Sequence, residues 1–169
     1  AQPDVFQLEE QIAGDCRLQR VIRLPGPQPL ARADLGSAGG PILLDHAALA
    51  PVQVGDTLRL VLYWQTEYPV SERFTVFTQL FDPAGQLVAQ QDNWPVNGLA
   101  PTDSWQVGTL VRDPYQLQLP ADAQPGEYQL WIGLYDAEDL ESGRRTLILA
   151  DGSETDHLEI PVVVDMLNR

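Results

Sequence analysis

Turn-forming residues recur along this chain at intervals that suit short β-strands and leave little room for helices. Glycine accepts positive φ and proline presets φ, so combinations of glycine, proline and aspartate favour tight turns. Such combinations separate short apolar runs at residues 39–41, 54–56, 82–85, 125–127 and 151–153. In a chain of 169 residues, this spacing predicts an all-β fold, an antiparallel two-sheet sandwich, immunoglobulin-like or jelly-roll, with about eight to nine strands.

The runs between the turns show the alternation expected of strands that bury one face. Residues 115–119 alternate between apolar and polar side chains and stop at Pro120. Residues 57–65 place one apolar set on a single face, namely Leu58, Leu60, Leu62 and Trp64. Each segment is therefore predicted to be a strand with one side toward the core.

Two further patterns add detail to the sandwich. Residues 74–81 and 86–91 flank the turn at residues 82–85 and predict a β-hairpin. A later strand is expected over residues 157–164, where Pro161 cannot donate a ladder hydrogen bond. Pro161 therefore predicts an edge position or a bulge.

The segment before the strand at Leu130 resembles the tyrosine corner of immunoglobulin-like sandwiches. In that corner, a tyrosine near the start of a strand donates its hydroxyl to the upstream backbone. Asp122, Gly126 and Tyr128 have the matching spacing. The alternative is an ordinary turn with Tyr128 as an ordinary core residue.

The domain organisation is predicted from one proline-rich stretch, residues 25–29. Residues 1–30 are interpreted as an N-terminal strand or linker that packs on the main domain, because so short a piece cannot bury a core of its own. Residues 31–169 are predicted to form the sandwich.

Charge and composition restrict the partners. The 24 acidic and 10 basic residues give a formal net charge of −14, which repels phosphate backbones and anionic lipid surfaces. We therefore expect no nucleic acid partner. No run approaches the roughly 18 apolar residues that span a bilayer, so direct membrane insertion is not expected. One cysteine excludes an internal disulfide and a cysteine-based zinc site.

A long loop at residues 92–108 holds two tryptophans and little strand character. Loops of this length in compact domains are usually functional or disordered, and tryptophans argue against disorder. Flat aromatic rings with amide and carboxylate groups suit a glycan, which makes the candidate ligand-binding set Trp94, Trp105, Asn93, Asn97 and Asp103. The alternative is that both tryptophans plug the end of the sandwich.

A second candidate is an aromatic contact surface formed by Tyr63, Trp131 and Tyr135. Alternation places these rings opposite the core-facing residues of their strands. Exposed aromatic residues on a sheet suit a ligand or protein contact. The alternative is that the N-terminal segment covers them.

Calcium is a possible ligand, although no cofactor is otherwise expected. Oxygen ligands suit calcium, and a short acidic run supplies them at Asp136, Glu138, Asp139 and Glu141. The alternative is a solvated acidic turn.

Catalysis is not expected. His46 and His157 are the only histidines, and the chain has no Gly-x-Ser-x-Gly elbow, phosphate-binding glycine loop or His-Glu-x-x-His helix. His46 follows an apolar run and is interpreted as a polar residue at a strand end.

Several motifs together resemble a bacterial domain family. These are residues 54–58, 62–64, 74–77, 80–85, 101–102, 125–128 and 133–136, with Trp105, Gly108, Asp113 and Tyr115. They resemble the extracytoplasmic β-sandwich appended to some bacterial multi-spanning membrane glycosyltransferases, over roughly residues 31–164. The resemblance implies an extracytoplasmic setting and no catalytic residue. We therefore predict a non-catalytic accessory domain that binds a glycan weakly, or a structural or protein–protein contact module, whose partner could be the membrane portion of its own parent protein.

Overall fold

The computed structural model describes residues 5–13, 16–23, 28–37, 40–50, 52–149 and 152–166. In these ranges the chain forms strands and three short 3-10 helices, with no α-helix and no helix that could cross a membrane. The all-β prediction is confirmed. The elements are β1 Val5–Ala13, β2 Cys16–Arg23, β3 Gln28–Ser37, β4 Gly40–Leu49, β5 Val52–Gln53, β6 Thr57–Thr66, β7 Phe74–Phe81, β8 Leu87–Asn93, η1 Pro95–Gly98, η2 Thr102–Ser104, β9 Val111–Gln118, β10 Gly126–Asp136, η3 Leu140–Ser142, β11 Leu147–Ile148, β12 Glu154–Thr155 and β13 Leu158–Asp165.

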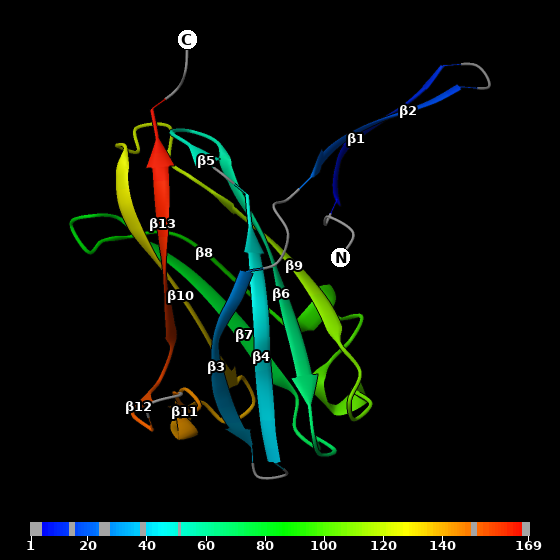
Figure 1. Cartoon of the computed structure of the whole chain (residues 1–169), viewed down its shortest axis with the longest axis vertical. Coiled ribbons are helices and arrows are strands. Elements are labelled where there is room, and N and C mark those ends of the chain that lie inside the picture. The colour runs from blue at the N-terminus through cyan, green and yellow to red at the C-terminus, as the bar shows by residue number, and fades with distance from the viewer. Residues whose placement is uncertain are drawn as a thin grey trace.

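Two sheets pack face to face as a sandwich (Figure 1). The five-stranded sheet has the order β5-β13-β10-β7-β8, and the six-stranded sheet has the order β12-β11-β3-β4-β6-β9. The chain crosses between the sheets from β6 to β7 and returns from β8 to β9, so that β9 pairs with β6. The pairing differs from the purely antiparallel prediction at one place, since β5 runs parallel to β13.

The described residues form more strands than predicted. The additional strands include the N-terminal hairpin β1–β2, which is a sheet of its own, and the two-residue strands β5 and β12. A strand over residues 146–149 was also predicted from the sequence, and β11 lies within it. Strands of two residues are too short to show a period in the sequence. Residues 24–27, which hold much of the proline-rich connector, lie outside the described residues. The packing of the N-terminal segment on the sandwich stays a prediction.

The core lies between the two sheets and uses the faces expected from alternation. β9 and β13 bury every second residue along most of their length. Burial of one large apolar side chain contributes about 1.5–3 kcal/mol. The main inward residues are Leu58, Leu60, Leu62, Trp64, Tyr115 and Leu117 from the six-stranded sheet and Phe74, Val76, Leu80, Leu130, Ile132 and Leu134 from the five-stranded sheet.

Two local predictions are also confirmed. β7 and β8 form the expected hairpin, and its turn includes Gly85 with a φ of 79°. Pro161 lies opposite Gln129 of β10. β13 lies between β5 and β10, but it pairs with β5 only at Val164 and Asp165, so at Pro161 no described strand lies on that side and the strand is locally an edge.

The tyrosine corner is present. Tyr128 is buried in β10, and its hydroxyl donates a hydrogen bond of 2.8 Å to the carbonyl oxygen of Gln124. The bond joins the last turn before β10 to the strand itself. It therefore fixes the position at which the chain enters the centre of the five-stranded sheet.

A buried carboxylate ties the long loop after β8 to the core. Asp113 of β9 is 1% exposed. Its carboxylate accepts hydrogen bonds from the Trp64 indole at 3.1 Å, the Tyr115 hydroxyl at 2.7 Å and the backbone N–H of Val96 at 2.7 Å. Val96 and Asn97 have φ of 57° and 53°, a region that residues other than glycine rarely occupy. Asp113 therefore stabilises an unfavourable loop conformation.

Replacing Tyr128 by Phe tests the corner. The substitution removes the hydroxyl and leaves the carbonyl of Gln124 without this donor, while the ring keeps its packing. We expect a loss of about 1 kcal/mol in the free energy of unfolding, measured by chemical denaturation. An unchanged denaturation midpoint would show that the corner does not stabilise the fold.

The stability of the domain should also carry a contribution from Asp113 that depends on pH. Burial raises the pKa of Asp113 to about 6, although the three donated hydrogen bonds act in the opposite direction. An acid with a higher pKa in the folded state stabilises the fold most below its unfolded pKa, and this contribution disappears as the pH rises through the folded pKa.

Asp113→Asn removes this titration. Between about pH 7 and pH 4, wild-type stability should rise relative to the variant by on the order of 2 kcal/mol. The measurement is a series of urea denaturations of both proteins across this range. Parallel stability curves would mean that Asp113 keeps an ordinary pKa.

Candidate functional site

Aromatic rings gather on the solvent-facing side of the five-stranded sheet. They come from β7, from β10 and from the segment before β13, and we call this surface the outer aromatic face. The rings of Phe81 and Trp131 have centroids 4.3 Å apart, and those of Trp131 and His157 are stacked at 3.7 Å. Phe77 and Tyr135 lie 6.4 Å apart. The face thus consists of Phe81, Trp131, Tyr135 and His157, with Phe77, which is 1% exposed, buried beneath Arg144.

Two hollows interrupt the outer aromatic face, and both combine ring surface with polar groups. The Tyr135 hollow has a volume of about 230 Å³ and is lined by Phe77, Gln79, Asp92, Tyr135, Leu140, Gly143 and Arg144. The Trp131 hollow has a volume of about 320 Å³ and is lined by Phe81, Asp82, Pro83, Gly85, Glu127, Gln129, Trp131 and Glu159. Since Gln79 and Trp131 are direct neighbours across β7 and β10, the two hollows adjoin.

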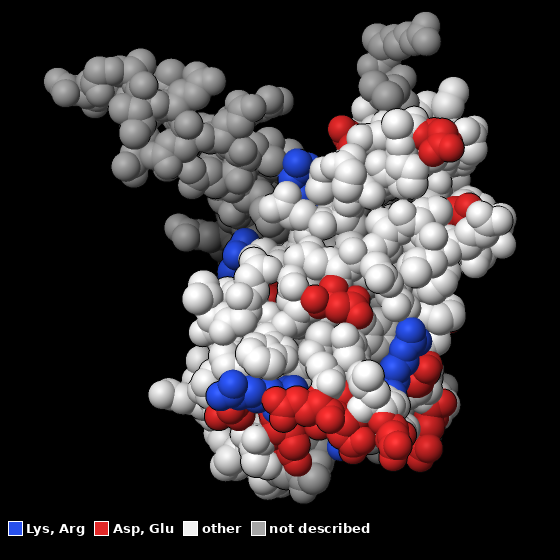
Figure 2. Space-filling model, turned by 180° about the vertical axis from the view of Figure 1, so that it is seen from behind, with Lys and Arg blue, Asp and Glu red and all other residues white. Residues whose placement is uncertain are grey.

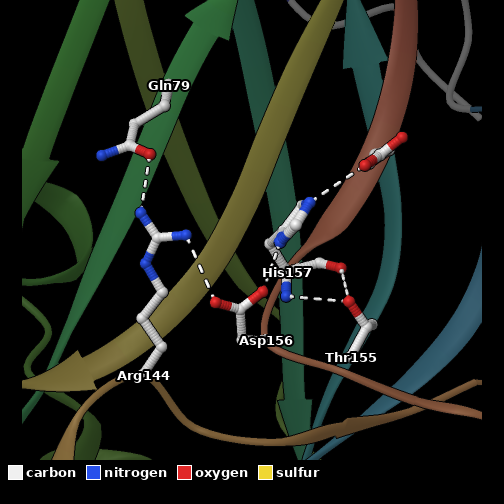
Figure 3. Close-up of polar contacts among 6 residues, drawn as sticks. Gln79, Arg144, Thr155, Asp156 and His157 are labelled. Carbon is white, nitrogen blue, oxygen red and sulfur yellow. Dashed lines mark hydrogen bonds and ion pairs between the residues drawn. The ribbon is translucent and has the colours of Figure 1, made fainter.

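Arg144 contacts two residues that line the Tyr135 hollow and one residue beside it. Its guanidinium lies 4.3 Å from the centroid of the Phe77 ring, donates a hydrogen bond of 2.9 Å to Gln79 and contacts the Asp156 carboxylate at 3.5 Å. Figure 3 shows the side chain reaching between these two partners. A cation over a ring face is favourable, so Arg144 fixes one wall of the hollow.

His157 lies between two carboxylates and against the Trp131 ring. Figure 3 shows it beside Asp156. Its Nδ1 lies 2.5 Å from an Asp156 oxygen, and its Nε2 lies 3.0 Å from a Glu159 oxygen. His157 therefore links Asp156, Glu159 and the Trp131 ring into one set of contacts.

The local environment shifts the pKa values of three groups on or beside this face. The pKa of Asp92 lies above its ordinary value, because the effect of burial exceeds the opposing effect of the hydrogen bond from the Tyr135 hydroxyl. Burial and the charge of Asp92 raise the pKa of Tyr135, which stays a neutral donor. The hydrogen bond from His157 lowers the pKa of Asp156, which stays a charged acceptor.

The predicted glycan loop is divided between core and surface. Trp105 is 8% exposed, packs on Trp64 with centroids 6.4 Å apart and donates its indole N–H to Ala100 at 2.8 Å. It plugs the end of the core, which was the alternative for this residue, and leaves no flat face for a sugar. Trp94 is 37% exposed, with the Arg73 guanidinium 5.5 Å from its ring.

The polar side chains of that loop bond to other groups of the protein. Asn93 donates a hydrogen bond of 2.9 Å to Asn97. Asp103 accepts from Arg73 at 2.7 Å. The structure therefore brings Trp94 and Asp103 to a common arginine and places Asn93 and Asn97 as a pair beside Trp94, while Trp105 turns inward.

The predicted contact surface is also divided. Trp131 and Tyr135 share the outer aromatic face, as alternation predicted. Tyr63 lies in β6 of the other sheet and is 8% exposed. It is not part of the core cluster, so it lies on the covered outer side of the six-stranded sheet. The single surface predicted from all three aromatic residues is therefore wrong.

The predicted calcium residues do not form a ligand cluster. Among the described residues, no three His, Cys, Asp or Glu side chains come together in a group that could hold a metal ion. The Asp136 carboxylate instead accepts the backbone N–H of Glu138 at 2.8 Å. A hollow of about 430 Å³ there is lined by Ser71, Glu72, Arg73, Asp103, Asp136 and Glu138. Asp139 and Glu141 are exposed. Figure 2, which views the side opposite to Figure 1, shows acidic side chains gathered in a band across the lower part of the molecule, with basic side chains among them.

Several residues of the outer aromatic face were not expected from the sequence. Phe77 and Phe81 belong to a strand whose inward face could not be assigned, since both faces are rich in apolar residues. Arg144 and His157 lie in irregular segments on either side of β11 and β12. Phe77 and Phe81 share a strand face with the polar residue Gln79, which lies two positions from each. This polar residue is the sequence signal that could have identified the outward face.

Comparisons with known proteins leave the family open. No protein-family model matches the chain, and no curated protein matches it. Among solved structures, it is similar to a glycosyl hydrolase family 2 member from Bacteroides cellulosilyticus, with a TM-score of 0.43 and 15% sequence identity over 69% of this chain. The chain spans 13% of that protein's length. The resemblance to a glycosyltransferase-appended domain stays a prediction.

The Phe77 ring occupies the space above Gly133, which gives a test of the face. A Cβ atom at Gly133 would lie 2.4 Å from the Phe77 ring and 3.0 Å from the carbonyl oxygen of Asp156. Gly133→Ala should therefore displace the ring and lower the free energy of unfolding by about 1–3 kcal/mol. Chemical denaturation measures the loss.

The double variant Gly133→Ala/Phe77→Ala provides the control. Removing the ring relieves the clash, so the two substitutions together should cost less than the sum of the single costs. Strict additivity would show that the ring does not lie on Gly133.

Proposed function

We propose that this chain is a non-catalytic accessory domain that binds carbohydrate across the outer aromatic face. The observation that carries the proposal is the mixture of rings and polar groups on the solvent-facing side of one sheet. A pyranose has apolar C–H faces and a rim of hydroxyls, so it needs an aromatic platform with hydrogen-bonding groups around it. The outer aromatic face supplies both.

Each hollow offers a complete set of these groups. In the Tyr135 hollow, Gln79, Asp92 and Arg144 stand around the Tyr135 ring, and Phe77 lies beneath Arg144. In the Trp131 hollow, Glu127, Gln129 and Glu159 surround the rings of Phe81 and Trp131. Since the hollows adjoin, an oligosaccharide could occupy both. Most of these side chains stand on paired strands, which reduces the entropy lost on binding.

The biological setting is part of the proposal. The domain acts on the outer side of a membrane, next to machinery that glycosylates the cell envelope. The motif resemblance supports this setting.

A protein-contact role is the second candidate, and exposed apolar residues in the end loops favour it. Leu99 is 85% exposed and Leu140 is 72% exposed. Tyr68, Val107 and Leu110 are also exposed in the loops after β6 and β8. Apolar groups on a surface can mark a protein interface.

A glycan-array screen, followed by titration calorimetry with the strongest hit, tests the carbohydrate proposal. Trp131→Ala removes the central ring of the face and should weaken binding about tenfold or more, which corresponds to about 1.4 kcal/mol. Trp94→Ala is the matched control, because it removes an exposed tryptophan outside the face and should leave affinity unchanged.

The two variants separate the alternatives. If Trp94→Ala abolished binding and Trp131→Ala did not, the site would lie in the loop after β8. An array without reproducible hits would contradict the carbohydrate proposal and favour the protein-contact role. Thermal denaturation of both variants checks that each remains folded.

A further inference from the structure

The charged side chains that line the Trp131 hollow are acidic. Its rim carries the carboxylates of Asp82, Glu127 and Glu159, and no described lysine or arginine lines it; His157 lies beside it, against Trp131 and Glu159. Its floor is apolar, with the rings of Phe81 and Trp131. The Tyr135 hollow, by contrast, holds both Arg144 and Asp92. The two halves of the outer aromatic face therefore differ in charge.

The carboxylates of the Trp131 hollow differ in how much of their binding capacity remains. One oxygen of Asp82 accepts the backbone N–H groups of Ala84 and Gln86 and shapes the β7–β8 turn. Glu159 contacts His157 through one oxygen, and its side chain is 56% exposed. Glu127 is exposed. Glu127 and Glu159 are therefore the carboxylates available to a ligand.

These two carboxylates lie at opposite ends of the hollow. Glu159 is the direct neighbour of Trp131 across β10 and β13, whereas Glu127 lies four positions before Trp131 on β10, next to Val163. A single cation cannot contact both ends at once. No group of three acids that could hold a metal ion forms among the described residues.

We propose that the Trp131 hollow selects sugars with free amino groups, so that the ligand is an oligosaccharide of N-unsubstituted amino sugars. This inference rests on the proposed carbohydrate function. One sugar ring lies against the exposed parts of Phe81 and Trp131 at the floor of the hollow, and ammonium groups on successive rings pair with Glu127 and Glu159. N-acetylation removes the charge and with it both ion pairs.

Titration of the whole chain with two matched hexasaccharides tests the inference. The probes are the hexamer of glucosamine and the hexamer of N-acetylglucosamine, compared at mildly acidic pH by calorimetry. We expect the glucosamine hexamer to bind about fivefold tighter or more, since partly exposed ion pairs contribute modestly. Glu127→Gln/Glu159→Gln should abolish this preference, because it weakens binding of the glucosamine hexamer far more than binding of the acetylated hexamer.

A control must separate the hollow from the overall charge of −14. Glu67→Gln/Glu154→Gln removes two exposed glutamates outside the outer aromatic face, and it should keep the preference. Equal loss of preference in the control would overturn the inference in favour of non-specific attraction. A lysine hexapeptide that binds as tightly as the glucosamine hexamer, with the same dependence on Glu127 and Glu159, would overturn it in favour of a basic peptide.

The remaining outcomes distinguish this inference from the proposed function. If the acetylated hexamer, or a neutral glycan from the array, binds best at a site sensitive to Trp131→Ala, the amino-sugar inference fails and carbohydrate binding stands. If no oligosaccharide binds at all, both fail.

Discussion

The strict alternation of side chains along β10 is the constraint on which the rest of the structure depends. This strand pairs with β13 on one side and β7 on the other, at the centre of the five-stranded sheet. Its inward residues, Tyr128 to Leu134 in steps of two, complete the core, and the intervening residues form the middle of the outer aromatic face. A shift of the pairing register by one residue would exchange the two sets. The core that specifies this register thus also specifies the candidate site.

The tyrosine corner helps to fix the pairing register of β10 at the start of the strand. Since Tyr128 is both a core residue and a donor to the turn before β10, the strand enters the sheet at one position only. Glycine at position 133 serves the same strand further on, because the absence of a side chain lets the Phe77 ring lie across the backbone. Arg144 then covers that ring. The site is therefore built on contacts that also stabilise the fold, and substitutions there need stability controls.

The sequence predicted the fold because its signals are local, whereas the candidate site depends on contacts between distant segments. Alternation and turn residues lie within a few positions of one another, so strands such as β6 and the β7–β8 hairpin could be located. The arrangement of Tyr63 and Trp131 on different sheets depends on where the chain crosses the sandwich, and a period of two residues holds no information on that. Trp105 was ambiguous for the same reason, since its burial requires Trp64, which lies in another strand. Asp113 could not be singled out either, because its three donors come from three segments.

The difference between the loop after β8 and the outer aromatic face is mainly one of available side-chain capacity. In the loop, Asp103 is paired with Arg73, the Asn93 and Asn97 amides bond to each other, and Asp113 holds the backbone at Val96. A ligand there would have to break these contacts, and any polar group left without a hydrogen-bond partner would lower the affinity. On the outer aromatic face, Glu127 and Gln129 stand on a paired strand with their polar ends toward solvent, and the rings beside them are already held in place by Arg144 and His157. At the Trp131 hollow a ligand can therefore reach the exposed Glu127 and the second carboxylate oxygen of Glu159, whereas Gln79 and Asp92 of the Tyr135 hollow already bond to Arg144 and Tyr135. This exposed capacity is the physical reason for placing the function on the outer aromatic face.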